Sequence, residues 1–509
     1  MNAHLPVLPI LWPLVIGALM LLFERRGIAL QRTLAWLGIG GLLVLSLALV
    51  RHADAGNIIV YLLGDWPARL GIALMVDRLS AWMVLVTTLL CAACLLHVGS
   101  GWDRRAPHFH ALLQFQIMGL NGAFLTGDLF NLFVFFEILL ASSYGLLLSG
   151  SRGGRIRTGF HYVVFNVAAS TLFLIALGVL YGLVGTLNMA EIAARAGEMA
   201  PGDRFLLQSA GGLLLVVFCA KGAVLPLYLW LPATYGRAQP AVAALLVIMT
   251  KVGAYAALRV FSLLFGTQAG DLSGFAWDWL LPAGIATLLM AGLGTLAAVR
   301  LRILAGYVVL ASAGTLFIAF SLATAEAVGA GLYYLAHSVF AGAALFLIVA
   351  LVRRHRVTDR TNVLLPIRDG WLSGGLYFVV AIALIGLPPL SGFIGKFTVL
   401  MATPDPHTAW VWSAVLASSF FMLVAMTRAG SRLFWLASPE PAATPPRINP
   451  TRAPLREVAA IVLLLGYVVA MTVAAGPLLR YTRSTGEQLA SPAHYIEALR
   501  APQPRLREP

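Results

Sequence analysis

Charged residues are scarce in this chain. Only 11% of its 509 residues are Asp, Glu, Lys or Arg, whereas 60% are hydrophobic. Soluble domains carry about 25% charged residues, because an aqueous surface must be covered by groups that water solvates. A long chain with so few charges can place its apolar surface only against lipid, which excludes a soluble globular protein.

Cysteine is also rare, and large polar loops are missing. The three cysteines, Cys91, Cys94 and Cys219, all lie in apolar segments, so no disulfide framework is indicated. Cys91 and Cys94 form a CAAC motif without further ligands, and we interpret them as two small helix residues rather than a redox or metal pair. No phosphate-binding loop follows a strand pattern. The sequence therefore predicts no cofactor and no bound metal.

Lysine is nearly absent. Of the 35 basic residues only three are lysines, and these three, Lys221, Lys251 and Lys396, all lie inside apolar segments. Arginine stays protonated in nearly any environment, whereas a buried lysine releases its proton more readily. A group that must release a proton inside a membrane can therefore be a lysine but hardly an arginine. We interpret the three lysines as transport residues rather than as side chains that snorkel to the interface.

Apolar stretches of about 20 residues, the length that crosses a bilayer, recur along the whole chain. They predict an all-α integral membrane protein of about fourteen transmembrane helices. The predicted spans are 6–23, 33–50, 74–98, 109–127, 129–149, 160–184, 206–231, 240–265, 277–299, 303–323, 328–352, 374–400, 408–436 and 455–479. The first is interpreted as a retained helix rather than a signal peptide, because no basic segment precedes it.

Arginine alternates between the loops. One set of alternate loops holds 21 arginines, and the opposite set of internal loops holds four. The positive-inside rule then predicts a multi-pass membrane protein, surrounded by lipid, with both termini on the outer side. The net charge of +14 thus reflects topology. It does not indicate a nucleic acid partner, since the basic residues form no stripe interleaved with aromatic residues.

Glu137 is the acidic counterpart of the lysines, midway along the span 129–149. Its expected partner is Lys221, since few other partners are available. Such a pair can act as a switch, because the lysine holds its proton less firmly when the carboxylate charge is drawn away. The alternative is a static pair that fixes helix packing.

Two lysines lie beside interruptions of their helices. Pro226 has no amide N–H, so the carbonyl of Gly222 loses its helical partner next to Lys221. Pro388 and the residues that follow it interrupt the segment of Lys396. Broken helices at mid-membrane depth are tolerated where they line a polar cavity, and transporters use them to bind ions.

Further polar residues extend this set. Tyr255 and Arg259 follow Lys251 at i+4 and i+8, which predicts a hydrated relay toward one side of the membrane. His337 is a single histidine in an apolar helix, and its position between the lysine-bearing segments favours a relay role over ordinary packing. Asp77 lies nearer a segment end and is at most supporting.

Two alternatives stay open for residues near segment ends. Asp77 could simply pair with its neighbour Arg78, and His161 lies close enough to a segment end to be at most supporting.

Several motifs occur in a fixed order along nearly the whole chain. They are DRLSAW at 77–82, TGDLFNLFVFFEIL at 126–139, KGAVLPLYLWLPATYGRAQPAVAALL at 221–246, TKVGAYAALR at 250–259, LYYLAHS at 332–338 and GLPPLSGFIGKF at 386–397. This order resembles the antiporter-like subunits shared by Mrp-type cation/proton antiporters and respiratory complex I. The chain length and the FNLFVFFEI wording are most similar to the D-type subunits of the Mrp (Pha, Mnh) complex.

The resemblance implies a role for each ionisable residue. Glu137 would be the transport glutamate, Lys221 its partner, Lys251 the central relay lysine and Lys396 the lysine of the terminal channel. Many relatives carry a lysine one turn after the histidine, where this chain has Ala341. His337 then carries the relay alone, or the second half-channel works through Lys396 and water.

The resemblance also implies two inverted five-helix repeats, each with one broken helix. The expected organisation is helices 1–3 at 1–108, a first repeat of helices 4–8 at 109–265, a second repeat of helices 9–13 at 277–436, helix 14 at 455–479, and a polar tail at 480–509 that is disordered or lies against a partner.

The implied function is that of a secondary transporter subunit, which is not an enzyme. It would exchange Na⁺ or K⁺ for protons together with subunits of the A, B, C, E, F and G types. The alternative is a proton-pumping subunit of a redox complex of the complex I or membrane-bound hydrogenase type. A polytopic transferase is disfavoured, because the charges lie at mid-depth and no large loop is available to hold a substrate. The sequence does not distinguish the cation, nor whether this subunit carries it.

Overall fold

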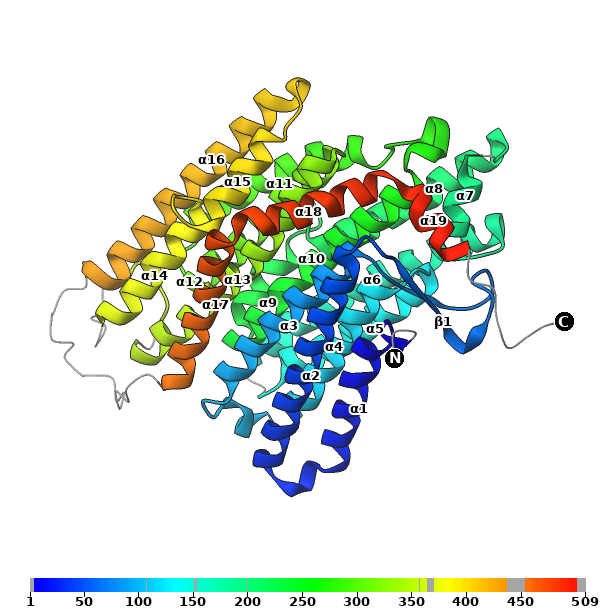
Figure 1. Ribbon diagram of the computed structural model, residues 1–509. Coiled ribbons are helices and arrows are strands. Elements are labelled where there is room, and N and C mark those ends of the chain that lie inside the picture. The colour runs from blue at the N-terminus through cyan, green and yellow to red at the C-terminus, as the bar shows by residue number, and fades with distance from the viewer. Residues whose placement is uncertain are drawn as a thin grey trace.

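The computed structural model describes residues 4–106, 108–150, 153–197, 199–356, 358–363, 370–436 and 454–500. This part of the chain is almost entirely α-helical (Figure 1). The helices are α1 (Leu8–Leu22), α2 (Ile28–Asp54), α3 (Arg78–Val98), α4 (Phe109–Leu125), α5 (Leu129–Leu148), α6 (Gly153–Val184), α7 (Met189–Ala196), α8 (Pro201–Gly222), α9 (Trp230–Arg237), α10 (Pro240–Leu264), α11 (Trp277–Ala297), α12 (Leu301–Ser321), α13 (Ala325–His355), α14 (Gly370–Ile385), α15 (Ser391–Met401), α16 (Asp405–Gly430), α17 (Leu455–Val473), α18 (Ala475–Ala490) and α19 (Pro492–Arg500).

The prediction of an all-α membrane protein with about fourteen spans is confirmed. Within the described ranges, 11 helices are long and apolar enough to cross a membrane. The shorter apolar helix α1 accounts for one further predicted span, and α14 with α15 together account for another. The helix α4 lies within the predicted span 109–127. The short turn at Gly127 and Asp128 does separate two helices, as predicted, because the Asp128 carboxylate accepts a hydrogen bond from the Asn131 amide and caps α5.

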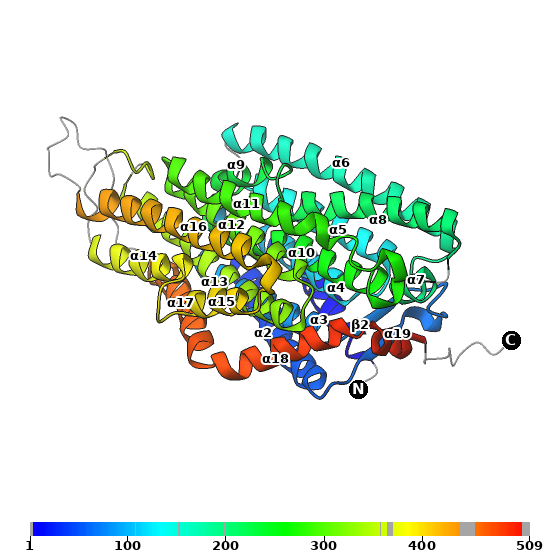
Figure 2. The same cartoon turned by 90° about the horizontal axis from the view of Figure 1, so that it is seen from above.

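The helices form a bundle around three buried members. α10, α12 and α13 are the most enclosed of the candidate spans, whereas α2, α6 and α16 expose large apolar side chains along one face. Figure 2 shows α6 at one edge of the bundle and α14 with α16 toward the opposite end. A helix that is apolar all round belongs in a protein core or in lipid, and both settings occur here.

A β-hairpin precedes the third span. Strands β1 (Ile59–Leu62) and β2 (Ala73–Val76) pair antiparallel, and α3 begins only at Arg78. The predicted span 74–98 is therefore wrong at its start, because Asp77 caps the helix with its side chain and leaves the preceding residues extended. The residues of β2 are as apolar as the helix that follows them, so hydropathy alone does not separate the two.

The chain after the last span is also helical as far as Arg500. The expectation of a polar tail that is disordered or lies against a partner is wrong for this part. α18 packs against α13 of the same chain and reaches α3 and α10, and α19 contacts α7 and the hairpin strand β1. Figure 1 shows α18 (red) crossing the bundle between α17 and α19. Residues 501–509 of the predicted tail lie outside the described residues.

Two spans are broken, one in each predicted repeat. α8 ends at Gly222, where Ala223 adopts a left-handed conformation (φ 57°), and α9 begins after a turn that contains Pro226. α14 ends at Ile385, and α15 begins at Ser391 after a turn that contains Pro388. The interruptions predicted from proline are thus confirmed, and both place backbone carbonyl groups without helical partners inside the bundle. The repeat boundaries themselves stay a prediction.

Candidate functional site

Lys221 lies in the last turn of α8, next to the first break. Its Nζ donates a hydrogen bond to Oδ1 of Asn166 on α6 at 3.2 Å and lies 5.9 Å from the centre of the Phe136 ring. The side chain is half-buried. A small cavity of about 20 Å³ adjoins it, between α5, α6, α8 and α10. This volume is enough for about one water molecule, which needs roughly 10–15 Å³.

Glu137 lies on α5 and faces α6. Ser170 on α6 donates a short hydrogen bond to Oε1 of Glu137. Glu137 and Lys221 form no direct ion pair within the described residues, so their pairing as a charge switch stays a prediction. Asn166 and Ser170 stand between them. These two residues are four positions apart on α6, so they share one helix face and each binds one member of the expected pair.

Lys251 is fully buried in the middle of α10. Its Nζ donates to Oγ of Ser312 on α12 at 2.7 Å and to Oγ1 of Thr250 at 3.3 Å. The broken end of α8 packs directly on α10 nearby, because a Cβ at Gly253 would lie only 2.4 Å from the amide nitrogen of Gly222. Glycine is required for that approach, and it brings the break beside Lys221 within a turn of Lys251.

Lys396 lies on α15 and reaches back to the end of α14. Its Nζ donates to the carbonyl oxygens of Ile385 at 2.8 Å and Leu384 at 3.3 Å, and to Oγ of Ser419 on α16 at 2.9 Å. The ammonium therefore satisfies carbonyl groups that the break leaves free, at the negative end of a helix dipole. Lys396 follows its helix break in sequence, whereas Lys221 precedes its own. In both halves the ammonium group nevertheless lies at the carboxyl end of the helix before the break, α14 for Lys396 and α8 for Lys221.

His337 on α13 faces the start of α15. Its Nδ1 lies 2.9 Å from Oγ of Ser391, the first residue of α15. The helices approach closely here, since a Cβ at Gly392 would lie 1.9 Å from the Ala383 carbonyl oxygen and 2.7 Å from Nε2 of His337. Ala341, one turn further along α13, is fully buried. The structure thus brings His337 next to the second break that carries Lys396.

The ionisable residues lie on a series of neighbouring helices. From one end of the series to the other, successive members of α5, α6, α8, α10, α12, α13, α15 and α16 contact one another. Each of the five predicted transport residues has a polar partner on a neighbouring helix of this series, which satisfies it inside an apolar bundle. Among the described residues, no hydrogen bond joins Lys251 directly to His337. The same is true, in that part of the chain, of Lys221 with Lys251 and of His337 with Lys396, so no continuous chain of hydrogen bonds joins the five residues.

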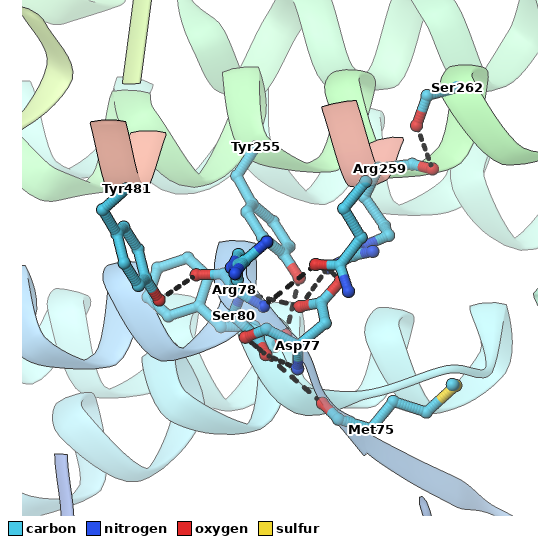
Figure 3. Close-up of polar contacts among 10 residues, drawn as sticks. Met75, Asp77, Arg78, Ser80, Tyr255, Arg259, Ser262 and Tyr481 are labelled. Atoms are coloured by element: carbon cyan, nitrogen blue, oxygen red, sulfur yellow. Dashed lines mark hydrogen bonds and ion pairs between the residues drawn. The ribbon is translucent and has the colours of Figure 1, made fainter. Parts of the chain in front are cut away.

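Asp77 and Arg259 form a buried ion pair at one end of α10. Arg259 Nη2 lies 2.7 Å from Oδ2 and 2.8 Å from Oδ1 of Asp77, and both side chains are almost fully buried (Figure 3). The alternative pairing of Asp77 with Arg78 is therefore wrong. Arg78 instead interacts with Asp54, and its carbonyl oxygen accepts a hydrogen bond from the Tyr481 hydroxyl of α18.

Tyr255 and Arg259 form an anchor rather than an open path. The Tyr255 hydroxyl donates to the Phe124 carbonyl oxygen at 2.6 Å. The guanidinium of Arg259 lies against the rings of Tyr255 and of Tyr495 on α19. Burial raises the pKa of the Tyr495 hydroxyl, so this ring stays neutral beside the ion pair. The predicted hydrated relay along these residues finds no support in this geometry, and His161 is exposed on the outer face of α6.

Sequence reasoning missed the small polar partners of the transport residues. They are Asn166, Ser170, Ser312, Ser391 and Ser419. A single Ser or Asn in an apolar helix is common, so only its position opposite an ionisable residue distinguishes it. The signal that was available was the four-residue spacing of Asn166 and Ser170 within one apolar span.

Comparison with known families agrees with this arrangement. The family model described as "NADH:quinone oxidoreductase/Mrp antiporter, TM" matches residues 126–422. The matched range includes all five predicted transport residues and both helix breaks. The chain belongs to this family.

Relatives match this family member over almost their whole length. A probable K⁺/H⁺ antiporter D-type subunit of Rhizobium meliloti is 38% identical, covering 98% of each chain. A Na⁺/H⁺ antiporter D-type subunit of Alkalihalophilus pseudofirmus is 32% identical, covering 97% of this chain and 99% of the relative. A chain of the Mrp complex from Dietzia sp. superposes with a TM-score of 0.89 at 25% identity, covering 98% of this chain and 99% of that one.

The same fold occurs in a redox complex. A chain of respiratory complex I from Thermus thermophilus superposes with a TM-score of 0.77 at 24% identity, covering 95% of this chain and 99% of that one. This likeness shows the fold alone.

The buried ion pair gives a test of its structural role. Asp77→Asn or Arg259→Gln alone leaves one buried charge without a counterion, which costs about 3–5 kcal/mol. We expect either variant to lower the unfolding temperature of the purified complex strongly. The fall in unfolding temperature of the double variant should be smaller than the sum of the two single falls, because the double variant leaves neither charge unpaired.

Arg78→Gln is the matched control, since the Arg78 guanidinium pairs, within the described part of the chain, only with the exposed Asp54. It should change the unfolding temperature little. Strictly additive losses in the double variant would show that Asp77 and Arg259 do not depend on each other.

Proposed function

We propose that this chain is the D-type subunit of a multi-subunit monovalent cation/proton antiporter and that it carries protons along the mid-membrane series from Glu137 to Lys396. The observation that carries the proposal is the placement of all three lysines of the chain. Each is held by polar groups of neighbouring helices within the bundle. The two relatives named above are described as D-type antiporter subunits, which supports this over a redox-driven pump.

The first half of the path joins Glu137 to Lys221 through α6. Because Asn166 binds the lysine and Ser170 binds the glutamate, the two charges influence each other without touching. A proton that arrives on Glu137 removes its negative charge, and Lys221 then holds its own proton less firmly. The released proton can pass by way of a water in the adjoining cavity toward Lys251 on α10.

The second half joins Lys251 to Lys396 by way of His337. Ser312 holds Lys251 from α12, and Ser391 holds His337 at the start of α15. Since the residue one turn after His337 is Ala341 and not an ionisable residue, His337 and Lys396 carry this half together. Lys396 can give up its proton while its nitrogen still faces the free carbonyls of α14 and Ser419. Asp77, Arg259 and Tyr255 support the path by fixing the end of α10, and Pro226 and Pro388 by breaking the two helices.

Glu137 also indicates a partner. It is only half-buried and lies on a face of α5 where Phe130, Ala141 and Leu148 are exposed. A carboxylate open to lipid at mid-membrane is costly, so we infer that another antiporter subunit covers this face. The partners would be subunits of the A, B, C, E, F and G types. The assembly would lie in the inner membrane with both termini of this chain outside, and its substrates are protons and Na⁺ or K⁺. It acts as a transporter and not as an enzyme.

Removal of the carboxylate tests the function directly. In everted vesicles from antiporter-deficient bacteria that express the whole complex, adding Na⁺ or K⁺ should collapse part of a preformed pH gradient, followed with a fluorescent dye. We expect Glu137→Ala to abolish this response at matched expression, because alanine cannot take up a proton and so cannot change how firmly Lys221 holds its own. The cation to which the wild type responds identifies the substrate.

Glu487→Ala is the control, since Glu487 is an exposed carboxylate of α18 paired with Arg483. It should leave antiport unchanged. A wild-type complex that assembles but responds to neither cation would favour the redox-driven pump, and a fully active Glu137→Ala complex would remove Glu137 from the path.

The two α6 residues allow a second test. Asn166→Ala and Ser170→Ala each remove a hydrogen bond to an ionisable group, worth about 1.5–3 kcal/mol. We expect roughly tenfold or greater loss of antiport rate and a shift in its pH optimum, which a purely structural role would not produce. Ser170→Thr, which keeps the hydroxyl, should restore most of the activity.

Thr171→Ala is the matched control, because the Thr171 hydroxyl bonds, among the described residues, only to the Val167 carbonyl of its own helix. If Asn166→Ala and Ser170→Ala lowered the rate without moving the pH profile, the two residues would be packing residues only.

A further inference from the structure

A cavity of about 490 Å³ opens among the helix ends that carry many of the arginines. Its walls come from the end of α3, the start of α6, the start of α10, the end of α13 and the start of α17. Charged and titratable side chains form a large part of its lining. They are His97, Arg105, Arg155, Arg353, Arg354 and Glu457.

The charge of this cavity is not balanced from within. Among the described residues, Glu457 is the one carboxylate that lines it, and Arg354 Nε already binds its Oε2 at 3.1 Å while Ser100 donates to its Oε1 at 2.9 Å. The side chains of Arg105 and Arg353 are exposed, and neither guanidinium forms a hydrogen bond or ion pair within the described part of the chain. The cavity therefore holds positive charge that no described carboxylate of its lining neutralises.

His97 gives an independent indication of a ligand. The residue is 3% exposed and lines the cavity, yet neither Nδ1 nor Nε2 has a hydrogen-bond partner among the described residues. Buried polar atoms are nearly always satisfied, so an unsatisfied pair needs an explanation. An imidazole N–H that faces a cationic cavity can donate to an oxygen of a bound anion.

The start of α10 adds to the positive electrostatic potential of the cavity. Gln239 and Pro240 line the cavity, and the positive end of the α10 dipole lies there. Its first amide groups are already capped, because Oε1 of Gln239 accepts hydrogen bonds from the N–H groups of Ala241 and Val242. An anion in this cavity would thus meet guanidinium groups and an imidazole, and α10 would contribute only its dipole.

We propose that this cavity binds a phosphate-bearing anion. Arg105 and Arg353 would hold the anion, and the His97 imidazole would donate a hydrogen bond to one of its oxygens. Guanidinium groups match the geometry of phosphate oxygens, and basic pockets between membrane helices bind anionic headgroups. The phosphate can come from free inorganic phosphate or from the headgroup of an anionic phospholipid. A bound anion would hold the end of α3, at His97, against the ends of α10 and α13. Lys251 lies further along α10, and His337 lies further along α13.

Thermal unfolding of the purified whole complex tests the site with two probes. In detergent, sodium phosphate is titrated against sodium chloride at equal ionic strength. In nanodiscs, phosphatidylcholine alone is compared with mixtures that contain phosphatidylglycerol. We expect a saturable rise in unfolding temperature with one probe, since a ligand that binds only the folded state stabilises it. A response to inorganic phosphate assigns a free anion, and a response to phosphatidylglycerol alone assigns a lipid headgroup.

The variants Arg105→Gln and Arg353→Gln, singly and together, should raise the half-saturating concentration at least tenfold. Both side chains are exposed and unpaired, so their loss should not disturb folding. His97→Asn should weaken binding through the lost imidazole. Arg25→Gln with Arg26→Gln is the matched control, since these arginines are exposed and line no part of this cavity. Equal responses of wild type and the double variant to both probes, or an equal effect of chloride, would overturn the proposal.

Discussion

The cost of placing a charge in lipid governs this structure. A lysine at the centre of a membrane helix costs roughly 3 kcal/mol on insertion, even when it can relax. The chain keeps its loops basic with arginine and admits lysine only at three interior positions. At each of these positions the ammonium meets oxygen atoms from a neighbouring helix. A buried ammonium group that has hydrogen-bond partners can keep its charge inside the membrane, and the cost of burial also lets it release its proton. A proton carrier requires both.

The two helix breaks extend the same constraint to the backbone. A free carbonyl in a bilayer is as costly as an unpaired side chain, and the end of α14 resolves this by bonding to Lys396. Glycine makes the approach possible, at Gly253 beside the first break and at Gly392 beside the second. The polar path and the tight packing thus depend on each other. If a side chain filled either glycine position, the helices would separate and the ionisable groups would lose their partners.

Hydrophobic runs and arginine alternation were enough to predict the membrane class and approximately fourteen spans. The proline interruptions were also predictable, because Pro226 and Pro388 remove backbone donors whatever the tertiary structure. The hydrogen-bond partner of Glu137 was not predictable from the sequence. The position of α6 sets the distance between Glu137 and Lys221, and no local sequence pattern encodes that position. The ion pair of Asp77 with Arg259 joins residues 182 positions apart. The helix α18 was missed because its sequence is polar and resembles a tail until α13 is present to cover one face.

The central claim is that the buried lysines must release protons and do not merely balance charge. Lys251→Arg tests it most directly, because arginine keeps the positive charge but does not deprotonate in a protein. The measurement is cation-dependent collapse of a pH gradient in vesicles that contain the assembled complex, with Arg300→Lys in an arginine-rich loop as the control. The account predicts an assembled but inactive Lys251→Arg complex and an active control. Antiport by Lys251→Arg at the wild-type rate would contradict it.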